Sequence, residues 1–356
     1  MLLLTTWFGS FLLDGDKIVH ERLFPSDAAR LADRLALVED WKVLDEEREL
    51  MGLADEVFVI EPRLERAGGN RTSESPPFLK SEDFGYGRDL LHAAMVDLAK
   101  RRMRKAIRPE DHLRQAVGAL DDLQEQGNLI VERVREWYGL HFPELARMVD
   151  AGEYLDLIAE HGRRETMPID HRESVGAELG TREEKNLKEL AALARTVAAE
   201  RKALEAYVDG SIRDLAPNVS EVAGPMIAAR LVAQAGSVED LARLPSGTIQ
   251  LLGAERALFR HLKTGARPPK HGVLFQHAWI HRAPPWQRGA IARVFAAKIA
   301  IAARADAFTK RRIAPDLVED LEHAVAEVRR RKATKPIRPK QRASLGQRAR
   351  QKRSRR

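Results

Sequence analysis

The chain has 356 residues, 44% of them hydrophobic, which is enough for two or three separate cores. It has no cysteine, which excludes disulfides, thiolate nucleophiles and the usual structural zinc ligands, and which is typical of an intracellular protein without redox chemistry. The formal charge is +7, but residues 329–356 hold fourteen Lys and Arg and no acidic residue, so subtracting this segment leaves −7 for the first 328 residues.

The N-terminal region begins with strand signals. The apolar start, Met1 to Leu13, lacks a basic segment and a small-residue cleavage site, so we expect a pair of strands and no signal peptide. Asp14 and Gly15, between two apolar runs, predict a hairpin. No apolar run of the chain is long enough to span a bilayer, and we expect no membrane partner.

The rest of the first 87 residues completes a small α+β module. Ser26 is expected to cap a helix that reaches Trp41, because apolar residues then recur at helical spacing. A strand is expected at residues 57–60, and the Gly-, Ser- and Pro-rich segment 66–87 is predicted to be a loop.

Residues 88–215 are predicted to be helical. The first helix, 88–106, ends in the basic run Lys100–Lys105, which we interpret as a solvated helix end. Two later helices carry apolar seams that step by three and four, and these positions are Ala116, Leu120, Leu123, Gly127, Ile130, Val134 and Trp137 in one and Leu187, Leu190, Ala194, Val197, Arg201, Leu204 and Val208 in the other. Such seams predict an antiparallel hairpin, which packs only on itself or also pairs with a second copy.

Two further segments have clear local signals. Between the two seams, Gly139 and Pro143 flank a tight aromatic corner, and His141 within it is interpreted as architectural because no nucleophile is nearby. Residues 216–312 are predicted to form a helical bundle, since Pro225 opens one helix and Ser237 begins a capping box for the next. Helices at 254–262 and 286–308 follow, joined by a loop dense in Pro, Gly, His and basic residues.

Four sequence runs carry a resemblance to a known family. The runs GAERALFR (Gly253–Arg260), PKHG (Pro269–Gly272) and RGAIARVFAAKIAIAARAD (Arg288–Asp306) resemble the signature of the Nop domain. REWYGLHFPEL (Arg135–Leu145) resembles a second hallmark of that family. With the N-terminal region, the resemblance covers nearly all of the chain up to about residue 310. The chain resembles the archaeal branch of the Nop family, the scaffold of the box C/D ribonucleoprotein that guides RNA 2′-O-methylation.

The pattern and the resemblance together imply a mainly α fold in four parts. These are a small N-terminal α+β domain that binds fibrillarin (1–87), a long antiparallel coiled-coil hairpin for homodimerisation (88–215), an all-α Nop domain (216–312), and a helical extension with a basic disordered tail (313–356). The resemblance also implies two further partners, a box C/D guide RNA and a kink-turn-binding ribosomal-type protein bound through the Nop domain. S-adenosylmethionine is expected on fibrillarin, and no cofactor is expected on this chain.

The resemblance assigns the first site residues. Gly253, Ala254, Glu255 and Arg256 match the family's GAEK-type motif with Arg in place of Lys, which implies a position where the Nop domain, the kink-turn RNA and its protein meet. Residues 257–260 match an adjoining ALFR motif, which the family places beside the guide duplex.

Within that second motif, Arg260 is the expected RNA contact. Leu258 and Phe259 are expected in the core of the bundle, because they are apolar and lie at helical spacing.

Other basic residues extend this candidate site. Lys270 and His271 on a stiff loop, with Arg282 and Arg288 flanking the next helix, are predicted to contact phosphates.

Helix amides near Trp286 are expected to favour an anion. Arg293 and Lys298 lie one and a half turns apart, so we expect one to contact RNA and the other to be solvated or paired.

The sequence lacks the motifs of an enzyme of its own. It has no GxxxxGK[ST] loop, GxGxxG turn or GxSxG elbow, and His271, His277 and His281 have spacings of six and four that match no zinc site. We therefore expect neither a catalytic centre nor a metal. Two alternatives stay open, a spliceosomal-type Nop assembly factor and a nonspecific basic RNA binder.

The basic tail and the cellular location complete these expectations. The tail either contacts nucleic acid by releasing condensed counterions or is a solubilising disordered end. The location is expected to be cytoplasmic for an archaeal source and nucleolar for a eukaryotic one.

Overall fold

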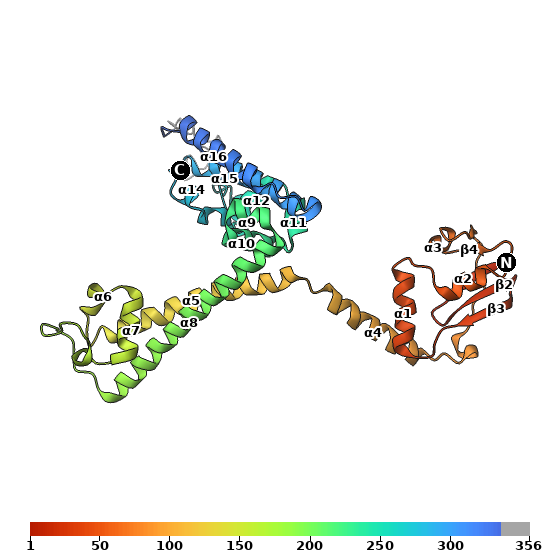
Figure 1. Ribbon diagram of the computed structural model, residues 1–356, viewed down its shortest axis with the longest axis horizontal. Helices are drawn as coiled ribbons and strands as arrows, with labels where there is room; N and C mark the ends of the chain where they lie inside the picture. The colour runs from red at the N-terminus through yellow and green to blue at the C-terminus, as the bar shows by residue number, and fades with distance from the viewer. Residues whose placement is uncertain (336–356) are drawn as a thin grey trace, which may run out of the picture. The chain divides into compact units, whose positions relative to one another are not determined.

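The computed structural model describes residues 1–335 and divides into two compact units, residues 1–108 (unit 1) and the chain from Pro109 onward (unit 2), each of which is described by itself. The mainly helical fold predicted from the sequence is confirmed, with strands in unit 1 (Figure 1). The four-part division by residue number is finer than these two units and stays a prediction. The predicted disordered tail lies, from Pro336 on, outside the described residues.

Unit 1 is built on a five-stranded sheet with the order β3-β2-β1-β4-β5. Its strands are β1 (Leu2–Thr5), β2 (Gly9–Asp14), β3 (Lys17–Leu23), β4 (Phe58–Val59) and β5 (Asn70–Arg71). Antiparallel pairs join β3 to β2 and β2 to β1, and parallel pairs join β1 to β4 and β4 to β5. The predicted hairpin at Asp14-Gly15 is confirmed, with Gly15 at φ +58°.

Strand β2, which lies between β3 and β1, explains part of the apolar start of the chain. Leu12 packs on one face with Leu3 and Val59, whereas Phe11 and Leu13 pack on the other face. A strand covered on both faces is apolar throughout, as residues 11–13 are.

Helices cover both faces of the sheet in unit 1. They are α1 (Ala28–Glu39), α2 (Asp45–Met51), α3 (Pro62–Glu65), a 3₁₀ turn (Ser81–Phe84) and α4 (Arg88–Ala106). The cap expected from Ser26 is wrong, because Asp27 is the N-cap residue and accepts from the Arg30 amide at 2.9 Å. Part of the basic end of α4 is paired, since Arg101 contacts Asp33 and Arg102 contacts Glu39 on α1.

Unit 2 begins with a long hairpin of α5 (Pro109–Tyr138) and α8 (Thr181–Leu215), which lie side by side and antiparallel (Figure 1). The two seam positions that departed from an apolar pattern are accounted for by packing. Gly127 allows close approach, since a Cβ there would lie 3.3 Å from Val197 Cγ1. Arg201 donates to Gln124 Oε1 across the hairpin at 2.7 Å and pairs with Glu205.

The tip of the hairpin carries α6 (Leu145–Met148) and α7 (Ala151–His161) and has its own apolar cluster. Buried His141 lies within hydrogen-bonding distance of the Ala177 carbonyl through Nδ1 (2.7 Å), and its Nε2 accepts from the Arg164 amide (3.0 Å). Because Nε2 accepts, Nδ1 carries the proton and donates. His141 ties the loop between α7 and α8 to the corner, which agrees with the architectural interpretation.

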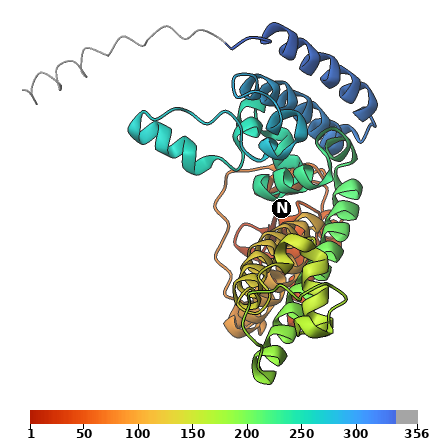
Figure 2. The same cartoon turned by 90° about the vertical axis from the view of Figure 1, so that its left-hand side faces the viewer.

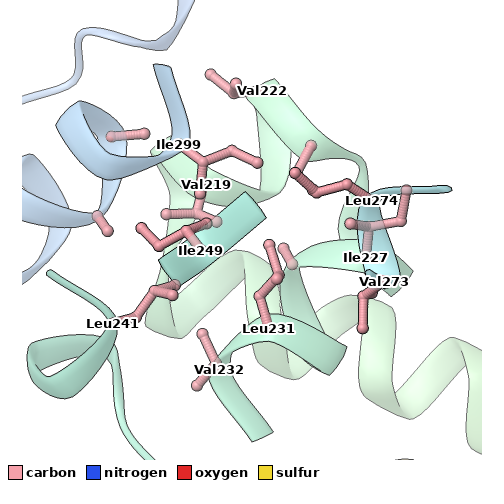
Figure 3. Packing of buried hydrophobic residues seen from close by; sticks show 14 of the residues in the cluster. Val219, Val222, Ile227, Leu231, Val232, Leu241, Ile249, Val273, Leu274 and Ile299 are labelled. Atoms are coloured by element: carbon pink, nitrogen blue, oxygen red, sulfur yellow. The ribbon is translucent and has the colours of Figure 1, made fainter. Parts of the chain in front are cut away.

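The remainder of unit 2 is a helical bundle over one continuous core (Figure 3). Its elements are α9 (Pro217–Ala223), α10 (Pro225–Ala235), α11 (Val238–Arg243), α12 (Ser246–Leu251), α13 (Glu255–Thr264), a 3₁₀ turn (Val273–Gln276), α14 (Ala278–His281), α15 (Arg288–Arg304), a π-helical turn (Ala305–Thr309) and α16 (Ala314–Arg331). The predicted cap at Ser237 is present, since its Oγ accepts from the Asp240 amide at 3.0 Å.

Helix α15 runs through the middle of this bundle. Its Ile291, Phe295 and Ile299 are fully buried and belong to the same core as Leu317 and Leu321 of α16. Among the described helices, none is long and apolar enough to cross a membrane.

Candidate nucleic-acid interface

A segment of unit 2 leaves the bundle and returns to almost the same point. This segment, residues 253–272, is called the α13 excursion. At its base the Gly272 amide donates to the Gln250 carbonyl (3.0 Å) and the Val273 amide donates to the Leu252 carbonyl (2.8 Å). A Cβ at residue 272 would lie 1.8 Å from the Leu252 carbonyl oxygen, so only glycine allows this closure.

The entry to the excursion explains the glycine and the glutamate of the GAER motif. Gly253 has φ +82°, and a Cβ there would lie 2.7 Å from Val273 Cγ2. Its amide donates to Glu255 Oε1 at 2.7 Å, while Ala254 is the N-cap residue of α13. These three residues shape the turn that directs α13 away from the bundle.

No residue of α13 is buried, and Figure 2 shows the helix, in cyan, standing clear of the rest of unit 2. The expectation that Leu258 and Phe259 belong to the core is therefore wrong. Leu258 is half-buried, Phe259 is 58% exposed and Leu262 is 68% exposed. Helical spacing predicts an apolar face correctly, but it does not tell whether that face is covered within the same chain.

The same helix presents cations to solvent. Arg256 and Arg260 are exposed, and neither has an acidic partner among the described residues. Lys263 and Arg267 share this exposure and lack of a partner, although they were not singled out from the sequence. The sequence feature that could have identified Lys263 and Arg267 is their place in the basic segment between Gly253 and Gly272.

Next to the base of the excursion, rings and cations pack together. His271 stacks on Phe275 with ring centroids 4.5 Å apart, and the Arg288 guanidinium lies 5.2 Å from the same ring. Burial, with the charges of Arg288 and Lys270, lowers the pKa of His271, so its imidazole is neutral near pH 7. A neutral imidazole on a preordered ring stack is suited to contact an unpaired base.

Two of the predicted phosphate donors in this cluster are held by backbone carbonyls. Lys270 Nζ donates to the Pro285 carbonyl at 3.0 Å. Arg288 donates to the carbonyls of Ala283 (2.8 Å) and His281 (3.0 Å). Lys270 remains exposed, whereas half-buried Arg288 mainly positions the loop.

The remaining predicted residues are two arginines without an acidic partner among the described residues and one lysine in an ion pair. Arg282 and Arg293 are exposed and have no acidic partner in the described part of the chain. Lys298 pairs with Asp320 of α16 at 2.7 Å, and its side chain is 20% exposed. Of Arg293 and Lys298, Lys298 is thus the one held in an ion pair.

The start of α15 differs from the expectation. The helix begins at Arg288 and not at Trp286. The amides of residues 287, 288, 290 and 291 are not free, because the first two donate to the Pro284 carbonyl and the other two donate to the Gln287 carbonyl. The side chains of Trp286 and Gln287 instead donate to the Lys332 carbonyl at 2.9 and 2.8 Å, which attaches the end of α16 beside the candidate interface.

The three histidines of this region have separate structural roles. His277 accepts from the Trp279 amide through Nδ1 (3.2 Å) and caps α14, and burial lowers its pKa. His281 lies edge-on to Phe275 at 5.2 Å, on which His271 stacks. Within residues 1–335 no cluster of His, Asp and Glu is suited to hold a metal ion.

The arrangement combines exposed cations on a projecting helix with a ring stack at its base. Guanidinium and ammonium groups contact phosphates, while rings stack on unpaired bases. The comparisons with known proteins agree with this class of ligand. A family model described as "Nop: snoRNA binding domain, fibrillarin" matches residues 119–327.

Individual relatives also match. A NOP5 family protein of Methanocaldococcus jannaschii is 36% identical in an alignment 285 residues long, which covers 71% of this chain and 69% of that protein. Nucleolar protein 58 of Scheffersomyces stipitis is 39% identical in an alignment 216 residues long, which covers 56% of this chain and only 42% of the nucleolar protein. A crystal structure of a fibrillarin/Nop5p complex matches 92% of this chain and all of its own chain, with 23% identity and a TM-score of 0.41.

Proposed function

The chain belongs to the Nop family, and from that premise we propose that it is a non-catalytic scaffold of a box C/D ribonucleoprotein. In this proposal it binds kink-turn RNA together with a kink-turn-binding protein and recruits a fibrillarin homologue, which carries S-adenosylmethionine and transfers the methyl group to the 2′-hydroxyl. The location is cytoplasmic in an archaeal source and nucleolar in a eukaryotic one.

The observation that carries the proposal is the α13 excursion. A helix with no buried residue gains little stability from its own chain, so its apolar and basic side chains are available to a partner. Arg256, Arg260, Lys263 and Arg267 supply charge to phosphates, and Phe259 supplies an exposed ring. RNA with a protein already bound to it offers both kinds of surface.

Cooperation with a second protein follows from how small this surface is. A single short helix and one ring stack bury too little area for tight binding alone. A kink-turn protein that has already ordered the RNA removes the cost of ordering it, so the apparent affinity of this chain rises. The relatives named NOP5 and nucleolar protein 58 favour this assembly over a spliceosomal one.

A homodimer through the hairpin is also part of the proposal. Leu129 of α5 and Leu193 of α8 are 53% and 49% exposed. Exposed leucines on a hairpin helix are expected where a second copy packs. A sedimentation mass of two protomers at micromolar concentration is the expected result, and a mass of one protomer would remove the dimer from the proposal.

The RNA claim is tested by gel-shift titration on a box C/D kink-turn RNA, with and without the kink-turn protein, at near-physiological salt. The variants are the full chain and a truncation after Thr334, which keeps α16 and its contact with Trp286. We expect the truncated chain to bind only when the kink-turn protein is present. Binding that requires residues 335–356 and ignores the kink-turn protein would contradict the proposal and indicate a nonspecific RNA binder.

A further inference from the structure

Unit 1 has a tryptophan in a backbone conformation that tryptophan rarely adopts. Trp41 has φ +60° and is the second residue after the last turn of α1. Its amide donates to the Val38 carbonyl (3.1 Å), and the Lys42 amide donates to the Leu37 carbonyl (2.9 Å). These two hydrogen bonds are those of a Schellman motif, in which the left-handed position is usually glycine.

The backbone conformation at this position does not explain why the residue is a tryptophan. A left-handed conformation is unfavourable for any residue with a Cβ and most unfavourable for bulky ones. The indole is also 58% exposed, so burial in its own unit offsets little of this cost. A strained residue that keeps a large exposed ring points to a use for that ring.

A buried ion pair fixes the loop that holds Trp41. Arg63 and Glu47 are 4% and 0% exposed and contact each other. Arg63 also donates to the Lys42 carbonyl at 2.9 Å, and Glu47 accepts from the Leu44 amide at 2.8 Å. These bonds join both ends of the 42–44 segment to the core, so the backbone next to Trp41 is held in place.

Two surface hollows border the indole. Trp41 and Arg63 line both, one of about 480 Å³ and the other of about 190 Å³. The other lining residues are Val43, Arg48, Met51, Arg66 and Ala67 in the first and Val38, Glu61 and Pro62 in the second. The Arg66 guanidinium lies 5.9 Å from the indole centroid and has no acidic partner among residues 1–335. Arg48 pairs with Asp45 at 3.2 Å and Arg63 pairs with Glu47 and Glu61. The surface therefore combines the apolar indole with polar side chains, and Arg66 is its cation without an acidic partner among the described residues.

We propose that Trp41, with Arg66 beside it, is the anchor by which unit 1 binds a protein partner that presents an apolar side chain next to a carboxylate. Tryptophan and arginine dominate the binding energy of protein interfaces, and apolar hollows on both sides of a ring accept side chains. An RNA base fits less well, because Arg66 already lies over the ring. The identity of the partner, a fibrillarin homologue, rests on the proposed function.

The test measures binding of the full-length chain to the fibrillarin homologue of the same organism by calorimetry. Trp41→Gly removes the indole and relieves the backbone strain. We expect the Kd to rise about 30-fold, the effect of losing an interface anchor, while the melting temperature stays unchanged or rises. Arg66→Gln should weaken binding about tenfold and reduce its salt dependence.

Phe78→Ala is the matched control. Phe78 is another exposed aromatic residue of unit 1, 87% exposed, and it lines a different groove of about 880 Å³ with Trp7, Leu91 and Met95. We expect this variant to bind like the wild type. Lost binding in Phe78→Ala with unchanged binding in Trp41→Gly would place the partner in that groove and overturn the proposal.

Three other outcomes separate the possible errors. Unchanged partner affinity with a marked fall in melting temperature in Trp41→Gly would show that the indole serves only the stability of unit 1. Weaker binding of guide RNA with unchanged fibrillarin affinity would show that the ring serves RNA, and either result overturns the proposal. A wild-type chain that does not bind fibrillarin would refute the proposed function itself.

Discussion

Asp306 is the buried carboxylate on which the end of the bundle depends. It is 2% exposed and lies in the π-helical turn that ends α15. It accepts hydrogen bonds from the Asn218 amide (3.1 Å), from Asn218 Nδ2 (2.6 Å) and from the Val219 amide (2.9 Å). It thereby caps the start of α9.

Asn218, held in this way, caps a second helix. Its Oδ1 accepts from the amides of Ile313 (2.7 Å) and Ala314 (2.9 Å) at the start of α16. One carboxylate therefore connects the end of α15 with the beginnings of α9 and α16. Asp306→Ala should leave the buried amides of Asn218 and Val219 without this acceptor and leave Asn218 Nδ2 with only the Arg311 carbonyl (3.0 Å). We expect this loss to destabilise unit 2 by about 3–5 kcal/mol. Asp306→Asn keeps one acceptor oxygen, so roughly half of that loss is expected.

The assay is thermal unfolding combined with hydrogen exchange of α9 and α16. A loss of this size should lower the melting temperature of unit 2 by about 10 °C and speed exchange at residues 217–223 and 314–331. Asp320→Asn is the control, because Asp320 is 65% exposed in its ion pair with Lys298, so solvent screens the pair and the melting temperature should barely change. A change below about 1 kcal/mol in Asp306→Ala would refute the reasoning.

Three further predictions concern the candidate interface and its support. Gly272→Ala should lower the free energy of unfolding, measured in urea, by about 2–3 kcal/mol, because the new Cβ would collide with the Leu252 carbonyl. Gly118→Ala, where a Cβ meets open space, is the control and should raise the free energy of unfolding by about 0.5 kcal/mol. Equal effects of the two substitutions would contradict the closure of the excursion. Since burial lowers the pKa of His277 below the unfolded value of about 6.5, its stabilising effect is complete above that pH and is lost as the pH falls through the folded pKa. His277→Asn keeps a cap acceptor without titrating, so it should lose less stability than wild type between about pH 7 and about pH 5, and an identical loss would exclude His277 as the cause. Arg256→Ala should weaken RNA binding in the presence of the kink-turn protein by roughly 1–3 kcal/mol with an unchanged melting temperature, and unchanged affinity would remove Arg256 from the interface.

The parts of the fold that were predictable are those with local signals. Asp14 and Gly15 between two apolar runs indicated a hairpin, and the apolar seams indicated α5 and α8. The bounds of α4 agree with the predicted 88–106. In each case, periodicity and turn residues act over a few positions and need no knowledge of distant contacts.

The features that were missed depend on distant partners. Phe259 has the spacing of a core residue, but the closure at Gly272 takes its helix away from the bundle. Lys298 forms an ion pair only because Asp320 lies opposite it on another helix, α16. The helical spacing that predicted a helix as far as Trp41 was misleading, because α1 ends at Glu39 and Trp41 occupies a left-handed position normally filled by glycine. The candidate interface could therefore be located by its motifs, while the role of each residue required the fold.

The central claim, that this chain assembles the methylation particle and does not itself transfer the methyl group, is tested most directly by reconstitution. Radiolabelled S-adenosylmethionine, guide RNA, target RNA, the kink-turn protein and the fibrillarin homologue are combined with and without the chain. We predict label at the guided 2′-hydroxyl only when both the chain and fibrillarin are present. Guided methylation that proceeds without the chain, or with the chain in place of fibrillarin, would contradict the account.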